Sequence, residues 1–259
     1  MRKKLLFVIY RLPGSGSERV TLNVMRGLDR TKFDPSLLVL RGDESSWDEL
    51  LKGIKVSGIV SKGRLQRQPL GVVWKMIRAC ASQDLIVGTV EGPATVVSFI
   101  ASALVRKPFL GIVQCEPSWI FSGPAKKFAW ISKLLYRRAK WLVFVSQSGL
   151  EDMRRWLGVQ KAPKGWSVIL NAFDRSSYPA GSQSESAPAL WPDDDVPTIL
   201  AAGKLEHRKG FDMLIRAHAR LADSGARLRL VILGEGRLRR ELEDLAKRLG
   251  VEDAISMPG

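Results

Sequence analysis

Short apolar runs alternate with segments of helical periodicity from Leu5 onward, and this alternation limits what the chain can fold into more than any other feature. Most runs lack a polar residue at every second position, as strands covered on both faces do. Such strands, separated by amphipathic helices, are typical of βαβ units and a parallel sheet. The pattern predicts an α/β protein with strands at residues 5–10, 35–40, 55–60, 85–90, 109–113, 142–145 and 167–170.

The predicted helices of this first part lie at residues 17–28, 47–52, 71–81, 94–105, 126–136 and 148–157. They complete a doubly wound first domain, which we place at residues 1–174. Residues 175–197 are rich in Ser, Pro, Ala and Asp and have no apolar period, which predicts a linker. Residues 198–259 then form a second domain with strands at 198–202, 228–233 and from 254, and helices at 210–222 and 237–249.

The chain has 259 residues, and its excess of 41 Lys and Arg over 26 Asp and Glu gives a formal charge of +15. Such a surface attracts polyanions, including nucleic acid, anionic lipid headgroups and phosphorylated substrates, although solubility alone can also account for it. No nucleic-acid-binding motif accompanies the charge. We therefore expect no nucleic-acid partner.

Cys80 and Cys115 are the only cysteines, and His207 and His218 are the only histidines. Neither pair has the spacing of a zinc site, and two isolated cysteines do not make a disulfide scaffold. No apolar stretch reaches the ~20 residues that span a bilayer. We expect a cytoplasmic protein without a metal.

A glycine-rich turn, PGSGSERVTLNVMRGL at residues 13–28, joins the first strand to the first helix. Glycines allow a ligand to approach the backbone, and the helix N-terminus offers unpaired N–H groups to an anion. The turn predicts a phosphate site at Gly14 and Gly16, with Arg19 nearby. The spacing is not GxGxxG, and a tight turn without a ligand remains the alternative.

The segment GKLEHRKG, residues 203–210, repeats this arrangement in the second domain. Lys204 follows a strand and Lys209 precedes a helix, so both can reach one crevice at the carboxyl edge of the sheet. Two ammonium groups suit a diphosphate, whose charge must be neutralised as it leaves. Gly203 belongs to the same predicted cradle.

The third turn, LVILGEGRLRREL at residues 230–242, places Gly234 and Gly236 after an apolar strand. These glycines can admit a nucleotide over the strand end. They can equally make a sharp turn, which is the better interpretation of the motif taken alone.

The segment AKKFAWISKLLYRRAKW, residues 125–141, reads as a basic amphipathic helix with Phe128, Ile131, Leu134 and Leu135 on one face. A helix of this kind can lie on an anionic membrane. It can also pack its apolar face on the sheet and leave its cations in water. Both interpretations remain open.

Taken in order, these motifs resemble those of the retaining family 4 glycosyltransferases of the GT-B type. The resemblance also covers LVFVSQSGLEDMRRWLGV (142–159) and VILNAFD (168–174). It implies two Rossmann-like domains, an acceptor-side domain followed by a donor-binding one. The implied activity is transfer of a sugar from a nucleotide diphosphate sugar to a glycan or lipid-linked acceptor, with a setting in cell-envelope polysaccharide synthesis.

The resemblance also assigns roles to single residues. Gly16 approaches the donor phosphate, and Lys204 and Lys209 hold the diphosphate leaving group as the catalytic cations. These cations take the place of a metal, so no metal or other cofactor is expected besides the nucleotide sugar. Peripheral binding to the inner face of the plasma membrane is left open.

The sequence departs from the family pattern at several positions. Lys204 stands where the family usually has Arg, which replaces a bidentate phosphate contact with a point charge. In the hinge motif, Asn171 and Asp174 match but Ala172 replaces a glycine.

After the fifth strand, the family often has a histidine near the sugar, and here Gln114 occupies that position with Glu116 close by. Glutamine can hydrogen-bond a sugar hydroxyl but does not transfer protons at neutral pH. The acidic Glu-x7-Glu motif of the family is not reached before Gly259, so the second domain is expected to be incomplete. The alternative function is a truncated, catalytically silent fragment that retains only acceptor or membrane-surface binding.

Overall fold

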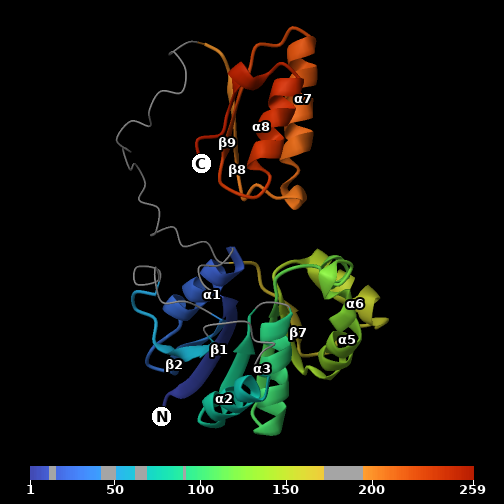
Figure 1. The fold of residues 1–259 in the computed structure, drawn as a ribbon. Helices are drawn as coiled ribbons and strands as arrows, with labels where there is room; N and C mark the ends of the chain where they lie inside the picture. The colour runs from blue at the N-terminus through green and yellow to red at the C-terminus, as the bar shows by residue number, and fades with distance from the viewer. Residues whose placement is uncertain (12–15, 42–50, 62–68, 90–91, 172–194) are drawn as a thin grey trace. The chain divides into compact units, whose positions relative to one another are not determined.

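The computed structural model describes residues 1–11, 16–41, 51–61, 69–89, 92–171 and 195–259. The chain divides into two compact units, Met1–Pro179 and Ala180–Gly259 (Figure 1). Most of the predicted linker, and with it Ala172 and Asp174 of the hinge motif, lies outside the described residues.

The first unit contains a seven-stranded parallel sheet with the strand order β3-β2-β1-β4-β5-β6-β7. The change of direction between β1 and β4 is the switch point of a doubly wound sheet. The strands are β1 (Lys3–Arg11), β2 (Phe33–Arg41), β3 (Val56–Ser61), β4 (Leu85–Gly88), β5 (Phe109–Val113), β6 (Trp141–Phe144) and β7 (Trp166–Val168). Each lies where the apolar runs predict a strand.

Helices cover the two faces of this sheet unequally. The helices are α1 (Gly16–Gly27), α2 (Pro69–Ala81), α3 (Pro93–Leu104), α4 (Pro117–Ile120), α5 (Ala129–Arg138) and α6 (Gln147–Leu157). Leu22 and Met25 of α1 pack against Phe7 and Ile9 of β1 on one face. The opposite face carries α2 and α3 over β1, β2 and β4, and α5 and α6 over β5 to β7. Right-handed crossovers along the strand order account for this arrangement.

The basic helix differs from the prediction. Residues Pro124–Phe128 form a 3₁₀ turn, η2, and α5 begins only at Ala129. Ser132 and Tyr136 face the core, whereas Phe128 and Leu134 are each 45% exposed. Ile131 and Leu135 of the predicted apolar face are half-buried, whereas its other two members, Phe128 and Leu134, are exposed. The prediction is therefore only partly right, because packing turns the side with Ser132 and Tyr136 toward the core.

Two further helices test the sequence analysis. The four-residue helix α4 was not predicted, because Pro117 and Ser118 also fit a turn. The helix predicted at residues 47–52 lies mostly outside the described residues.

The second unit is a three-stranded parallel sheet with the order β10-β9-β8. Its strands are β8 (Thr198–Ala202), β9 (Arg229–Leu233) and β10 (Ile255–Ser256), and its helices are α7 (Phe211–Asp223) and α8 (Arg239–Arg248). Both helices pack on the face that carries Leu230 and Ile232, with Ile215 and Leu242 in the same cluster. The unit has its own apolar core, in the βαβαβ order that the sequence predicts.

Candidate functional site

The candidate site of the first unit lies at the carboxyl edge of the seven-stranded sheet. Helix α1 begins at Gly16, and a Cβ placed there would meet no atom within 4 Å. A side-chain position on Gly16 therefore meets open space among the described residues, and the helix end that begins there is the one that favours an anion. Arg19 lies exposed in the first turn, while Gly14 lies outside the described residues.

Gln114 connects this helix end to another strand. It follows β5, and its amide Nε2 donates to the carbonyl oxygen of Ser17 at 3.4 Å. The hydrogen bond brings Gln114 beside the first turn of α1. Glu116 is exposed and immediately precedes α4. The structure thus gathers Gly16, predicted to approach the donor phosphate, and the predicted substrate-binding residues Arg19 and Gln114 at one edge, with Glu116 two residues beyond Gln114.

A buried aspartate fixes the segment that follows Glu116. Asp152 on α6 is 6% exposed, and its two carboxylate oxygens accept from the backbone N–H of Ser118 at 2.9 Å and from its hydroxyl at 2.7 Å. Such charge-assisted bonds at the start of α4 hold the end of the Gln114–Glu116 segment in place. Sequence reasoning missed this tie, since nothing local relates residues 34 positions apart.

The candidate site of the second unit, described by itself, lies in the β8 to α7 connection. Lys204 forms an ion pair with Glu206 at 3.0 Å, and Glu206 also accepts from Arg208 Nε at 3.2 Å. The hydrogen bond from Lys204 is the main reason why the pKa of the Glu206 carboxyl is lowered. Glu206 is therefore the counter-ion that the sequence analysis did not identify.

Lys209 lies differently from Lys204. A Cβ on Gly203 would lie 3.5 Å from Cε of Lys209, so the lysine stem runs past the backbone at the end of β8. In the part of the chain that the structure describes, no ion pair neutralises its ammonium group. Lys209 thus presents a charge at this strand end that an added anion can neutralise.

Gly234 and Gly236 have a backbone explanation. A Cβ on Gly234 would lie 2.1 Å from the carbonyl oxygen of Gly203, and one on Gly236 would lie 2.4 Å from that of Leu205. The backbone after β9 therefore lies directly against the backbone after β8, which only glycine allows. These contacts bring Gly203, Gly234 and Gly236 together, whether or not a nucleotide also binds there.

Arg239 links the segments that follow β9 and β10. Its guanidinium pairs with Glu235 and with Glu243, and Nη1 donates to the carbonyl oxygen of Met257 at 2.8 Å. The hydrogen bond between Arg239 and Glu235 is the main reason why the pKa of Glu235 is lowered and that of Arg239 is raised. The turn after β9 is thereby tied to the segment after β10.

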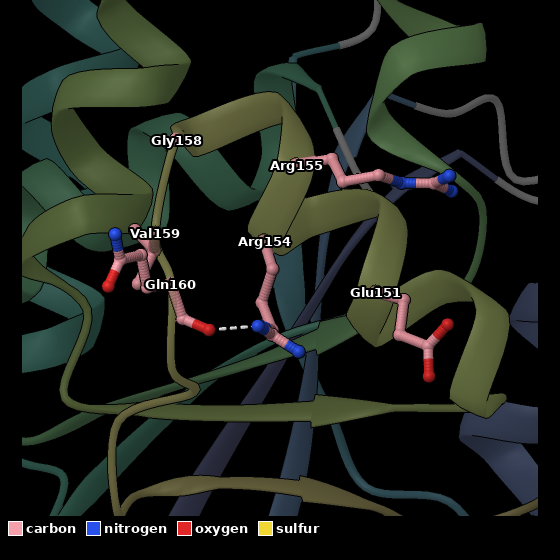
Figure 2. A pocket seen from close by; sticks show the side chains of 6 residues that line it. All are labelled: Glu151, Arg154, Arg155, Gly158, Val159 and Gln160. Atoms are coloured by element: carbon pink, nitrogen blue, oxygen red, sulfur yellow. Dashed lines mark hydrogen bonds between the residues drawn. The ribbon is translucent and has the colours of Figure 1, made fainter.

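A hollow of about 450 Å³ lies elsewhere in the first unit, at the C-terminal end of α6. Figure 2 shows its lining residues and the hydrogen bond from the Arg154 guanidinium to the carbonyl oxygen of Gln160. A helix that follows a parallel strand returns toward the amino edge of the sheet. The hollow therefore lies at the opposite edge from Gly16 and Gln114, and none of the predicted site residues lines it.

Neither a metal site nor a membrane span occurs among the described residues. No three His, Cys, Asp or Glu side chains there gather as a metal site requires. No helix in the described part of the chain has both the length and the apolar character needed to cross a bilayer.

Comparison with known protein families agrees with the two parallel sheets and with the glycines and cations at their carboxyl edges. Residues 15–164 match the glycosyl transferase 4-like domain, and residues 182–259 match the glycosyl transferases group 1. The chain belongs to the family 4 glycosyltransferases. The resemblance seen in the motifs is confirmed, and so is the enzyme class.

Individual relatives of this glycosyltransferase agree. It is 29% identical over 269 residues to an N-acetylgalactosaminyltransferase of Campylobacter jejuni, whose full name specifies a diphospho-undecaprenol-linked acceptor. That match covers 99% of this chain and 69% of the relative. An uncharacterized glycosyltransferase of Haemophilus influenzae is 23% identical, over 98% of this chain and 68% of its own length. The chain thus spans about two thirds of the length of these relatives.

Solved structures show the same fold. The Anabaena protein HepE, crystallised with UDP and glucose, matches with a TM-score of 0.77 at 19% identity, over 100% of this chain and 69% of HepE. The lipopolysaccharide outer core galactosyltransferase WaaB matches with a TM-score of 0.65 at 17% identity, over 99% of this chain and 68% of its own. The predicted Rossmann-like, GT-B type of fold is confirmed.

Proposed function

We propose that this glycosyltransferase transfers a sugar from a nucleoside diphosphate sugar to a lipid-linked glycan in cell-envelope polysaccharide synthesis. The second unit is the donor side and the first unit the acceptor side. The observation that carries the proposal is Lys209, whose stem passes Gly203 at the end of β8 and whose ammonium group has no ion-pair partner among the described residues. The polyprenyl-linked acceptor named for the Campylobacter jejuni relative supports the choice of acceptor class.

In this mechanism, the two lysines stabilise the diphosphate as it leaves. Negative charge grows on the diphosphate when the bond to the sugar breaks, and fixed cations at the reacting edge lower the energy of that state. Lys209 contributes its charge directly. Lys204 contributes when its ammonium group leaves the Glu206 carboxylate and pairs with the diphosphate instead, because the diphosphate carries more negative charge than the carboxylate. We propose that these cations serve in place of a metal.

The glycines and the first unit have supporting roles in the proposal. Gly203, Gly234 and Gly236 keep side chains away from the strand ends, so that the phosphates reach the backbone. On the acceptor side, Gln114 hydrogen-bonds a sugar hydroxyl without transferring a proton. Arg19 and Glu116 bind acceptor groups, and Gly16 leaves the α1 N-terminus open to a phosphate. The protein acts peripherally at the membrane that holds its acceptor.

The test compares the binding of UDP and of uridine, which lacks the phosphates, by titration calorimetry. Lys209→Met is expected to weaken UDP binding by about 10-fold to 100-fold, as loss of a charge-assisted phosphate contact does, and to leave uridine binding unchanged. Arg208→Met, which removes a neighbouring exposed cation, is the matched control and is expected to change UDP binding by less than about threefold. Unchanged UDP binding by Lys209→Met would contradict the proposal.

An assay of sugar transfer tests the class of acceptor and the need for a metal separately. Transfer of label from nucleoside diphosphate sugars to a polyprenyl diphosphate-linked glycan, with and without EDTA, is the assay. We expect transfer in both conditions. Transfer only to water-soluble glycans would overturn the lipid-linked acceptor, and loss with EDTA would overturn the role given to the lysines.

A further inference from the structure

The net positive charge of the chain lies in the first unit. Residues 1–179 hold 29 Lys and Arg against 13 Asp and Glu, a net +16, whereas residues 180–259 hold 12 against 13, a net −1. The unit that carries the proposed diphosphate cradle is therefore nearly neutral. The excess positive charge of the chain therefore lies in the first unit.

Within the first unit, the charge is most one-sided over residues 117–150. This segment contains six cations and no carboxylate: Lys126, Lys127, Lys133, Arg137, Arg138 and Lys140. The segment runs through α4, η2 and α5 to the start of α6. Its cations are therefore not neutralised by neighbours in the sequence.

The same segment exposes large apolar side chains. Trp130 is 69% exposed, and Phe128 and Leu134 are each 45% exposed. Trp130 and Leu134 are four residues apart, so they share the side of α5 opposite Ser132 and Tyr136, which are buried. Helix α5 thus turns Ser132 and Tyr136 toward the core, keeps Ile131 and Leu135 half-buried, and leaves Trp130 and Leu134 in water.

Cations flank these apolar side chains. Lys126 and Lys127 are exposed in η2, and the ammonium group of Lys127 lies 5.2 Å from the centre of the Phe128 ring. Arg138 is exposed one turn beyond Leu134. We call this set the η2–α5 surface: Lys126, Lys127, Phe128, Trp130, Leu134 and Arg138.

We propose that the η2–α5 surface docks the enzyme on an anionic phospholipid bilayer. Trp130, Leu134 and Phe128 enter the interface, and the cations contact the headgroups. The inference deepens and rests on the proposed lipid-linked acceptor, because a docked first unit meets such an acceptor where it resides. A nucleic acid would use the cations and stack on aromatic rings, but it gives no reason for an exposed Leu134.

The first experiment measures flotation of the full chain with vesicles of phosphatidylglycerol and phosphatidylcholine in equal parts. Trp130→Ser is expected to weaken binding by about tenfold, because the indole loses its apolar contact with the interface. Trp74→Ser is the matched control, since Trp74 on α2 is 60% exposed, close to the 69% of Trp130, and a cation, Arg78, lies over its ring. An equal loss in the two variants, or no loss in Trp130→Ser, would overturn the assignment of the surface.

The second experiment changes charge alone. Each Lys or Arg near an anionic bilayer contributes about 1 kcal/mol, or about fivefold. The double variant Lys126→Gln, Lys127→Gln is therefore expected to bind about 25-fold more weakly. Lys161→Gln, Lys164→Gln removes the same charge from an exposed loop of the same unit and is expected to bind almost as the parent does. If both double variants bind vesicles equally weakly, the net charge of the unit accounts for binding, and the assignment of a docking surface fails.

Two further measurements separate the ways in which the inference can fail. Urea unfolding of the first unit, followed by tryptophan fluorescence, is expected to be the same for the charge variants as for the parent chain, and a loss of stability would overturn the interpretation of the vesicle data. Binding of UDP to the second unit is expected to be unchanged in all the variants. If UDP binds and the parent chain does not float with anionic vesicles, the docking surface fails while the donor half of the proposed function stands. Binding to duplex DNA that Lys126→Gln, Lys127→Gln abolishes, without vesicle binding, would replace the bilayer with a nucleic acid.

Discussion

Both units join parallel strands to helices at a carboxyl edge, but they hold that edge in different ways. In the first unit, side chains make the ties, with Asp152 holding Ser118 and Gln114 reaching Ser17. In the second unit, the backbone after β9 lies directly on the backbone after β8, at Gly203 and Gly234. A backbone contact fixes the spacing of a strand edge, whereas side-chain ties can be exchanged without moving the strands. The rigid edge is the one we assign to the donor diphosphate.

The largest expected effect breaks the backbone contact of the second unit. Gly234→Ala places a Cβ 2.1 Å from the carbonyl oxygen of Gly203, so one of the two segments must move. We expect a loss of about 3 kcal/mol or more in the free energy of unfolding. Hydrogen exchange measured by mass spectrometry would show it as faster exchange in β8 and β9.

Gly250→Ala is the control that separates the effect of a steric clash from the effect of a positive φ. Gly250 has a φ of +67°, and a Cβ added to it would meet no atom within 4 Å, so only the left-handed backbone is strained. Its loss is expected to be about 1 to 2 kcal/mol. Equal losses in the two variants would show that the contact between Gly203 and Gly234 does not fix this edge.

The next effect breaks a side-chain tie of the first unit. Asp152→Ala removes both acceptors of Ser118 and is expected to lower the free energy of unfolding by about 2 kcal/mol. Urea unfolding followed by tryptophan fluorescence suits this unit, which holds seven of the eight tryptophans. Glu151→Ala, at the exposed neighbouring position, should cost less than about 0.5 kcal/mol. A loss of similar size at both positions would remove the special role of the buried tie.

The smallest expected effect concerns a side-chain tie in the second unit. The pKa of Glu206 is lowered from 4.5 chiefly by Lys204, so this pair stabilises the fold above about pH 4.5 and the stabilisation is lost as the pH falls through the folded pKa. Because the pair is partly exposed, we expect less than about 0.5 kcal/mol. Glu206→Gln should make hydrogen exchange of the second unit less sensitive to acid, and Lys204→Met should do the same. Unchanged acid sensitivity in both would mean that the ion pair does not act on stability.

The strands could be placed well from the sequence because each buried strand must be apolar along its whole length, which is a local property. Sequence reasoning failed where the outcome depended on partners far along the chain. Asp152 looks like an ordinary helix acid until α4 is placed beside α6. Glu206 lies only two residues from Lys204, but which side chains meet in an irregular loop is decided by the backbone of the loop and not by the sequence spacing. Lys204 and Lys209, equal in the sequence, differ in the structure because, among the described residues, only Lys204 has a carboxylate in reach.

The sequence by itself determined the α/β order of the elements, the positions of the glycine turns and the family, because apolar periodicity and glycine spacing are written locally. The tertiary structure alone decided which side of α5 faces the core. The apolar residues at positions 126–136 predict an amphipathic helix, but α5 begins only at Ala129, and packing of Ser132 and Tyr136 against the core leaves Trp130 and Leu134 in water. Periodicity predicts that a helix has two faces, and only the surrounding core selects the one that is buried.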